Sequence, residues 1–145
     1  MHSPILSAVQ HFRRYYNQLF LPMAAQYGLS QLEMDVLLFL HNNPEYNTAR
    51  DIVELRGFAK SNVSTAIETL RARDYLTVAP DARSRRVHRL HLTPEGRPVA
   101  AELAACQQAG LARLLAGFTP EERAHLRQLL SRIDGNLTAA LRQEG

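Results

Sequence analysis

Four arginines fall close together in the middle of the chain. Arg83, Arg85 and Arg86 lie in the polar segment 79–86, and Arg89 follows in the next segment. Like charges held this close repel one another unless a polyanion is near, so we interpret the cluster as an anion-binding hairpin tip. Narrow A·T-rich minor grooves concentrate negative potential and attract arginine, which makes double-stranded DNA the expected partner. A solvated loop without a partner is the alternative.

The charge balance of the whole chain agrees with this interpretation. Residues 56–97 carry nine basic and four acidic side chains, a net charge of +5, whereas all 145 residues sum to +3. The rest of the chain therefore sums to −2. A basic centre between mildly acidic flanks indicates a surface for a large anion, and nucleic acid is the commonest one.

A second polar set lies just before the arginines, in an amphipathic segment from about Lys60 to Arg73. Its apolar residues recur at helical spacing and are expected to face the core: Val63, Ala66, Ile67 and Leu70. Short polar side chains on the other face allow close approach to the major groove, where asparagine can pair with both edge atoms of adenine. The candidates for contact with bases or phosphates are Lys60, Ser61, Asn62, Ser64 and Thr65, with Thr69 also outward. An ordinary solvated helix face is the alternative.

Three further elements are expected to position the arginine cluster and the polar side chains of residues 60–73 relative to each other. A short helix from about Thr48 to Leu55 ends near Gly57, only a few residues before the helix of 60–73. Two helices so joined around a glycine are typical of a helix-turn-helix. Residues 75–78 and 87–92 read as two strands of a hairpin with the arginines at its tip. A helix-turn-helix followed by a basic hairpin, here called the wing, predicts a winged helix: a mainly α, α+β fold.

Capping patterns predict four more helices. They begin at Ser3-Pro4, Ser30, Thr93-Pro94 and Thr119-Pro120. Pro22 is expected to kink or fray the last turn of the first of them. The first and last helices each carry an apolar stripe, formed by Ile5, Val9, Phe12, Tyr16, Leu19 and Met23, and by Leu126, Leu129, Leu130, Ile133, Leu137 and Leu141.

A compact winged helix cannot cover both stripes, so we expect them to pack against the same pair of helices from a second chain. A twofold dimer is the commonest closed arrangement, and intrachain packing is the alternative. The expected organisation is one domain over 1–145, with a DNA-binding lobe at 30–96 and dimerisation helices at 1–28 and 97–145.

From Ser30 to Gly96 the chain resembles the MarR family of winged-helix repressors. Residues 60–70 resemble the recognition helix of that family, and Asp81-Ala82-Arg83-Ser84-Arg85-Arg86 with Leu92-Thr93-Pro94-Glu95-Gly96 resembles its wing and the start of the next helix. The wing residues expected at DNA are Asp81, Arg83, Ser84, Arg85 and Arg86, with Asp81 holding one of the arginines in place. The resemblance implies an obligate homodimer on a pseudo-palindromic operator.

Two positions depart from the family pattern. Asp74 stands where glycine is usual, although aspartate tolerates the left-handed conformation better than most residues. Ala59 stands where a polar cap is commoner, so the helix of 60–73 should start less firmly.

The resemblance also implies an effector. Family members often bind small aromatic or anionic molecules between the dimer helices and the winged helix, and His11, Arg14, Tyr15 and Tyr16 are the candidates for such a crevice. The same aromatic residues would equally suit a dimer core. We expect a repressor released by a small molecule. A constitutive regulator or architectural DNA-binding protein is the alternative, and a thiol- or metal-responsive sensor is less favoured.

Other classes of function find little support. The histidines lack close ligand spacing except His88-x-x-His91, whose members lie on opposite faces of a strand, so no metal is expected. Cys106 is a lone cysteine on an apolar stripe, which suits a small hydrophobic side chain and a reducing cytoplasm. No glycine-rich phosphate loop, H-E-x-x-H or G-x-S-x-G motif is present, so we expect neither an enzyme nor a cofactor. No apolar run approaches a membrane span of about 20 residues, and no signal peptide is visible.

Overall fold

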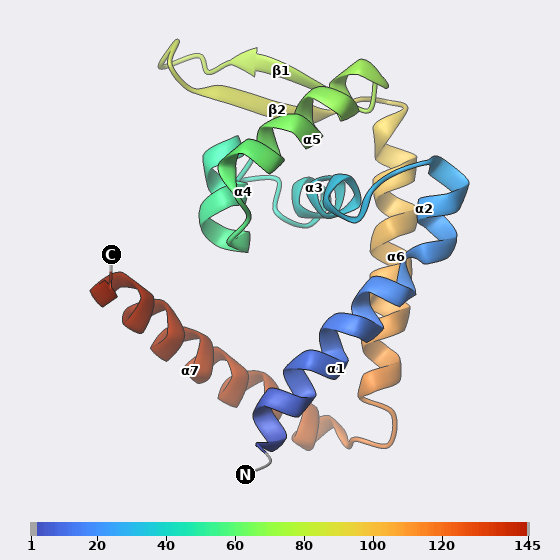
Figure 1. Ribbon diagram of the computed structural model, residues 1–145, viewed down its shortest axis with the longest axis vertical. Coiled ribbons are helices and arrows are strands. Elements are labelled where there is room, and N and C mark those ends of the chain that lie inside the picture. Colours follow the sequence, from blue (N-terminus) through green and yellow to red (C-terminus); the bar gives the residue numbers. More distant parts are fainter. Residues whose placement is uncertain (1–2, 145) are drawn as a thin grey trace. The chain divides into compact units, whose positions relative to one another are not determined.

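The computed structural model describes residues 3–144, and the chain divides into two compact units, Met1–Gly110 and Leu111–Gly145 (Figure 1). The fold is mainly helical with one small antiparallel sheet, which confirms the predicted fold class. In chain order the elements are α1 (Pro4–Leu19), α2 (Leu21–Tyr27), α3 (Gln31–Asn42), α4 (Ala49–Arg56), α5 (Lys60–Ala72), β1 (Leu76–Pro80), β2 (His88–Leu92), α6 (Gly96–Leu114) and α7 (Pro120–Glu144).

The predicted first helix is two helices. Ser3 caps α1 by accepting a hydrogen bond from the N–H of Leu6, and α1 ends at Leu19. Pro22 does not fray a last turn; it lies in the first turn of α2, where its missing N–H costs nothing. Phe20, fully buried, joins the two helices, and Gly28 ends α2 in the left-handed conformation with φ 63°.

Reciprocal caps start the next two helices. The Ser30 hydroxyl accepts from the N–H of Glu33, whose carboxylate accepts from the N–H of Ser30, as the sequence predicted. Thr48 and Asp51 form the same arrangement at α4. α3 is buried from Met34 to Leu40 and forms the centre of the core of this unit.

The sheet is a single hairpin packed on that core. Its register pairs Leu76 with Leu92 and Val78 with Leu90, which turns Leu76 and Leu90 inward. β1 follows α5 through Asp74, whose φ of 61° is the only positive value at a non-glycine position among the described residues. The aspartate therefore adopts the left-handed turn predicted for it.

α6 begins two residues later than predicted, at Gly96, because Pro94 and Glu95 form a turn. Thr93 still caps the helix, since its hydroxyl accepts from the N–H of Gly96 at 2.9 Å. A Cβ atom at Gly96 would collide with the backbone carbonyl of Tyr75, so glycine lets the residue before β1 lie close to the start of α6.

α1 packs closely on α6 within the first unit. The hydroxyl of Tyr15 donates to the carbonyl of Gly110 at 2.8 Å, and Gln107 donates to the hydroxyl of Tyr16 at 2.8 Å. A Cβ at Gly110 would overlap the side chain of Leu19. Gly110 therefore allows the close spacing of α1 and α6, and hydrogen bonds of Tyr15 and Tyr16 link the two helices.

The second unit holds the end of α6 and all of α7. Thr119 and Glu122 form the predicted capping box at the start of α7. One side of α7 is apolar and uncovered in the single chain, with exposed Leu129, Leu130, Ile133, Leu137 and Leu141. Within residues 3–144 no helix is both long and apolar enough to cross a membrane.

Candidate nucleic-acid interface

α5 has the two faces that its sequence predicted. Its buried residues are Val63, Ala66, Ile67 and Leu70. The opposite face exposes all five candidate contact residues, Lys60, Ser61, Asn62, Ser64 and Thr65. Thr69 is half-buried rather than outward, because it lies at the edge of the buried face.

Local hydrogen bonding shapes the start of α5. The Thr65 hydroxyl donates to the carbonyl of Ser61 at 3.0 Å, so its remaining lone pairs face outward as acceptors. Ala59 occupies the N-cap position and supplies no side-chain hydrogen bond, as predicted. The first N–H groups of α5 are therefore left without a side-chain cap.

Asp81 organises the wing. Its Oδ2 accepts from the N–H of Arg83 at 3.1 Å, and its Oδ1 accepts from Nε of Arg89 at 3.2 Å. These two hydrogen bonds, the first of them the larger influence, lower the pKa of Asp81 from its ordinary value. The backbone closes the same turn, since the N–H of Asp81 donates to the carbonyl of Val87 at 2.7 Å. An ionised carboxylate thus folds the tip back on the base of the wing.

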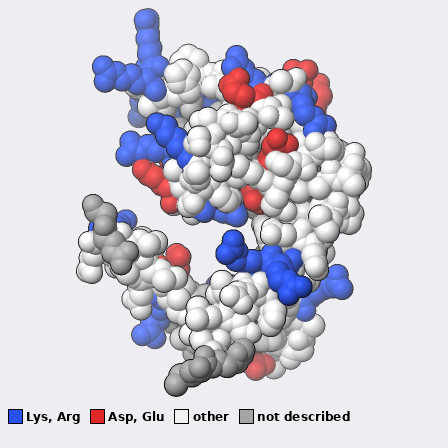
Figure 2. All heavy atoms as spheres, in the orientation of Figure 1, with Lys and Arg blue, Asp and Glu red and all other residues white. Residues whose placement is uncertain are grey.

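The wing arginines divide into two groups. Arg89 is the arginine that Asp81 holds, and its Nη1 also donates to Oδ1 of Asn47 at 3.0 Å. Arg83, Arg85 and Arg86 are exposed and make no ion pair within the described part of the chain. Ser84 is half-buried, and its carbonyl accepts from the N–H of Val87. Figure 2 shows Lys and Arg side chains projecting at the upper left, where Figure 1 places the tip of the wing.

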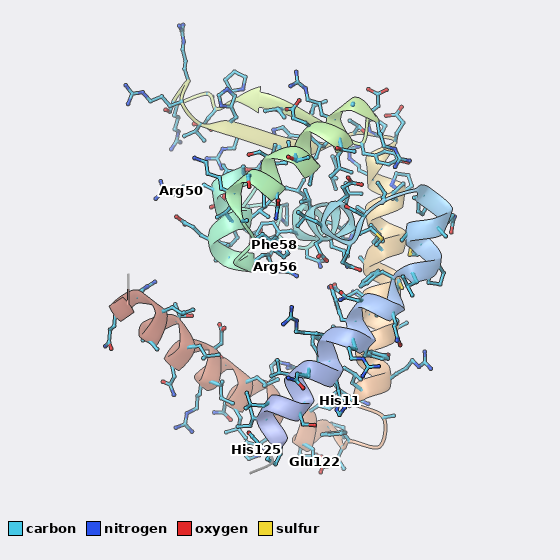
Figure 3. All side chains as sticks on the ribbon, in the orientation of Figure 1. His11, Arg50, Arg56, Phe58, Glu122 and His125 are labelled. Atoms are coloured by element: carbon cyan, nitrogen blue, oxygen red, sulfur yellow. The ribbon has the colours of Figure 1, made fainter. Side chains whose placement is uncertain are left out.

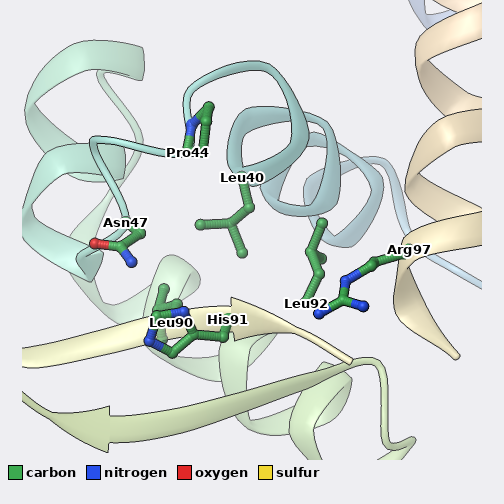
Figure 4. A pocket seen from close by; sticks show the side chains of 7 residues that line it. All are labelled: Leu40, Pro44, Asn47, Leu90, His91, Leu92 and Arg97. Carbon is green, nitrogen blue, oxygen red and sulfur yellow. The ribbon is translucent and has the colours of Figure 1, made fainter. Parts of the chain in front are cut away.

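Asn47 is a residue that sequence reasoning missed. Besides holding Arg89 through its side chain, it accepts from the N–H of Leu90 through its backbone carbonyl at 2.8 Å. Asn47 also lines a cleft of about 220 Å³ between α3 and β2, with Leu40, Pro44 and Arg97 among the other lining residues (Figure 4). A loop asparagine 42 positions away from its partner leaves no pattern in the sequence.

The four candidate effector residues lie in two different environments, two of them half-buried and two exposed. Tyr15 and Tyr16 are half-buried against α6 with their hydroxyls hydrogen-bonded, and burial raises the pKa of Tyr16. Tyr16 stacks with Phe12 and meets Phe20 edge-on, at ring-centre distances of 5.7 and 5.0 Å. His11 (Figure 3) and Arg14 are exposed on α1.

The remaining histidines and Cys106 bear on the less favoured alternative, a metal- or thiol-responsive sensor. Among residues 3–144, no three His, Cys, Asp or Glu side chains gather as a metal site would require, and His2 lies outside that range. The Cys106 thiol donates to the carbonyl of Leu19 at 3.5 Å, and burial raises the pKa of that thiol. A raised pKa reduces the thiolate fraction, which is the reactive form.

A helix-turn-helix of α4 and α5 followed by the β1–β2 wing defines a winged helix-turn-helix protein. Residues 27–87 match the MarR family model. Over 88 residues the chain is 32% identical to an uncharacterized HTH-type transcriptional regulator of Bacillus subtilis, YwaE, covering 61% of this chain and 52% of that protein. The chain therefore spans about half the length of this curated relative.

Solved structures of similar fold extend the likeness to the flanking helices. A MarR-family transcriptional regulator from Silicibacter pomeroyi is 26% identical, with 86% of this chain and 83% of that chain covered and a TM-score of 0.74. A protein from Listeria monocytogenes assigned to the same family, solved with a 26mer DNA, is 16% identical, with 96% and 92% covered and a TM-score of 0.85. These matches confirm the predicted resemblance of this chain to the MarR family.

Proposed function

We propose that this protein is a sequence-specific, double-stranded-DNA-binding transcriptional regulator that works as a homodimer in the cytoplasm. The observation that carries the proposal is the pairing of two surfaces in one unit. The polar face of α5 is exposed. Three arginines that make no ion pair among residues 3–144 project from a wing that Asp81 keeps folded. The Bacillus subtilis relative is named as a regulator, and the Listeria monocytogenes relative was solved with DNA.

The two surfaces suit two grooves of one duplex. α5 presents short polar side chains, of which Asn62 is suited to pair with an adenine edge in the major groove. Arg83, Arg85 and Arg86 would enter the neighbouring minor groove and contact phosphates. Arg89, held by Asp81 and Asn47, positions the wing rather than contacting DNA.

Dimerisation would bring two such lobes to one operator. In the first unit α1 exposes Ile5 by 71%, Leu6 by 65% and Val9 by 52%. In the second unit α7 exposes Leu130 by 53%, Leu137 by 57% and Leu141 by 70%. Exposed apolar rows of this extent mark interaction surfaces, and a second copy related by a twofold axis would bury both.

The regulatory part of the proposal is a repressor released by a small aromatic or anionic effector. His11 and Arg14 are exposed on α1 and can contribute polar contacts, although Nδ1 of His11 lies 3.5 Å from the Ser7 hydroxyl. Tyr15 and Tyr16 would first have to give up the hydrogen bonds that join α1 to α6. Loss of operator binding on addition of such a molecule supports this part. Operator binding that no small molecule changes would favour the constitutive regulator.

The test of DNA reading begins with sequencing the DNA that copurifies with the protein. Affinity is then titrated on that operator and on random duplex. Asn62→Ala should weaken operator binding by about 1–3 kcal/mol and leave random DNA unaffected. Arg83→Ala/Arg85→Ala should weaken both. Equal affinity of the wild type for operator and random DNA would instead indicate an architectural protein.

Dimer geometry is tested on the same operator. Half-sites read by a twofold dimer lie roughly 10 base pairs apart, so inserting about five base pairs turns one half-site to the far side of the helix. Affinity should fall towards the level of random DNA. If the spaced operator binds as tightly as the original, each lobe reads DNA alone.

A further inference from the structure

A basic groove lies between the first turn of α4 and the base of the wing. Its volume is about 560 Å³, and its lining includes Arg50, Arg86, His88 and Arg89. Asp51 is the acidic residue of this lining. Three arginines against one aspartate make the groove a candidate anion site. Neither Arg50 nor His88 belongs to the sets that the sequence analysis assigned to DNA.

Two of the charged residues in the groove are already engaged. Asp51 is turned back to the chain, since its Oδ2 accepts from the N–H of Thr48 at 3.2 Å. Arg89 is paired with Asp81 and bonded to Asn47. These contacts fix the walls of the groove. With Arg89 paired to Asp81, Arg50 and Arg86 exceed Asp51 by one positive charge.

Arg50 is restrained only weakly. Its Nε lies 2.8 Å from Oε1 of Glu54, one helical turn away, and the two side chains are 85% and 58% exposed. Surface pairs of this kind contribute little and are screened by salt. The bond occupies Nε alone, so the two terminal nitrogens of Arg50 remain as donors in the planar arrangement that matches a phosphate.

Arg50 lies between the two elements that we propose contact DNA, α5 and the wing. It also lines a neighbouring depression of about 390 Å³ that includes Lys60 and Ser64 of α5. Arg50 therefore stands between the exposed face of α5 on one side and Arg86 of the wing on the other. Figure 3 shows Arg50 on the same side of the unit as the tip of the wing.

We propose that Arg50 and Arg86, with His88 beside them, bind one backbone phosphate of the DNA strand that passes from the major groove at α5 to the minor groove at the wing. The inference rests on the proposed DNA binding and adds a site to it. A phosphate diester suits the groove because its single charge meets two guanidinium groups from opposite walls. A contact to phosphate carries no base information, so Arg50 contributes affinity and register rather than sequence preference.

The test compares charge variants of the full-length dimer on operator and random duplex over a salt series. Arg50→Ala should weaken binding to both by about three- to tenfold at low salt. It should reduce the slope of log K against log[salt] by about 0.9, the amount expected for one phosphate contact. Glu54→Gln should strengthen both, because it removes the acidic partner of Arg50.

Arg71→Ala is the matched control. Arg71 is also exposed and also pairs with a glutamate of its own helix, Glu68 at 3.6 Å, but it lies in the last turn of α5. Its removal should leave the salt slope unchanged. An unchanged slope in Arg50→Ala, with wild-type melting temperature, overturns the inference, as does an equal loss of slope in Arg71→Ala.

A neutral methylphosphonate placed at successive positions between the major-groove half-site and the flanking minor groove locates the phosphate. One position should weaken the wild type and have no further effect on Arg50→Ala. Equal weakening of both proteins at every position overturns the inference while leaving DNA binding intact. Failure of the wild type to bind any duplex would overturn the proposed function itself, and this inference with it.

Discussion

Arg89 donates from Nε to Oδ1 of Asp81 over 3.2 Å, across the base of the wing. The same arginine reaches Asn47 in the loop before α4, and the same carboxylate accepts from the N–H of Arg83 at the tip. One ion pair therefore joins three segments: the loop before the helix-turn-helix, the base of the wing and its tip. The orientation of the exposed wing arginines therefore depends on the Arg89–Asp81 ion pair, which does not itself have to contact DNA.

Asp81→Asn should weaken binding to operator and random DNA by about three- to tenfold, because the wing loses its charged anchor while Arg83, Arg85 and Arg86 remain. Hydrogen bonds from Arg83 and Arg89 lower the pKa of Asp81. The stabilisation is therefore present above the pKa of the unfolded chain and is lost as pH falls through the lower pKa of the folded protein. An NMR titration of the Asp81 carboxyl carbon should give a midpoint below 3.8, the ordinary value. A midpoint at or above it would contradict the anchor.

Asp35 behaves in the opposite way. It is 6% exposed in α3, its Oδ1 accepts from Gln31 at 3.1 Å, and burial raises its pKa. The folded state therefore holds the proton of Asp35 more tightly than the unfolded state does. The contribution of Asp35 to the stability of the protein is lost as pH rises through the raised pKa. Asp35→Asn keeps an acceptor for Gln31 and removes the charge. It should stabilise the protein by about 1 kcal/mol at pH 7.

That gain should shrink towards zero near pH 3, as measured by urea unfolding at both pH values. Glu45→Gln, at an exposed loop position, is the control and should change stability little. An Asp35→Asn gain of equal size at both pH values would show that the ionised carboxylate is not the cause.

The dimer is tested on α7. Leu130→Asp would place an unpaired charge in the proposed apolar interface. The dimer dissociation constant should rise at least about tenfold, a cost of roughly 1.4 kcal/mol. Gln128→Asp adds the same charge on the opposite side of the helix, about 160° away at 100° per residue, and should leave the dimer intact. Sedimentation velocity at micromolar concentration measures both, and a monomeric wild type would refute the arrangement.

Gly110→Ala tests the packing of α1 on α6. The added methyl would overlap the side chain of Leu19, so the substitution should cost about 1–3 kcal/mol despite the better helix propensity of alanine. Leu19→Ala/Gly110→Ala should destabilise by less than the sum of the two single changes, because the shorter side chain makes room. Additive losses in denaturant unfolding would show that the overlap is not the cause.

Local signals predicted much of this fold. The capping box at Ser30 depends on residues three positions apart, and comparison with the family pattern pointed to the uncapped Ala59 and the left-handed Asp74. Contacts between distant segments could not be read from the sequence. Asn47 binds Arg89, and Arg50 and Arg86 line one groove; only the folded chain brings these positions together. The division at Phe20 escaped prediction because an unbroken apolar stripe runs through both α1 and α2.

The side chain of Leu19 fills the space that a Cβ atom at Gly110 would occupy, although 91 positions separate the two residues in the chain. A lineage in which residue 110 gains a side chain must move or shorten the side chain at residue 19, or carry the cost of the overlap. The two positions should therefore drift as a pair, and their correlated change would record the crossing of α1 and α6 in the history of the protein.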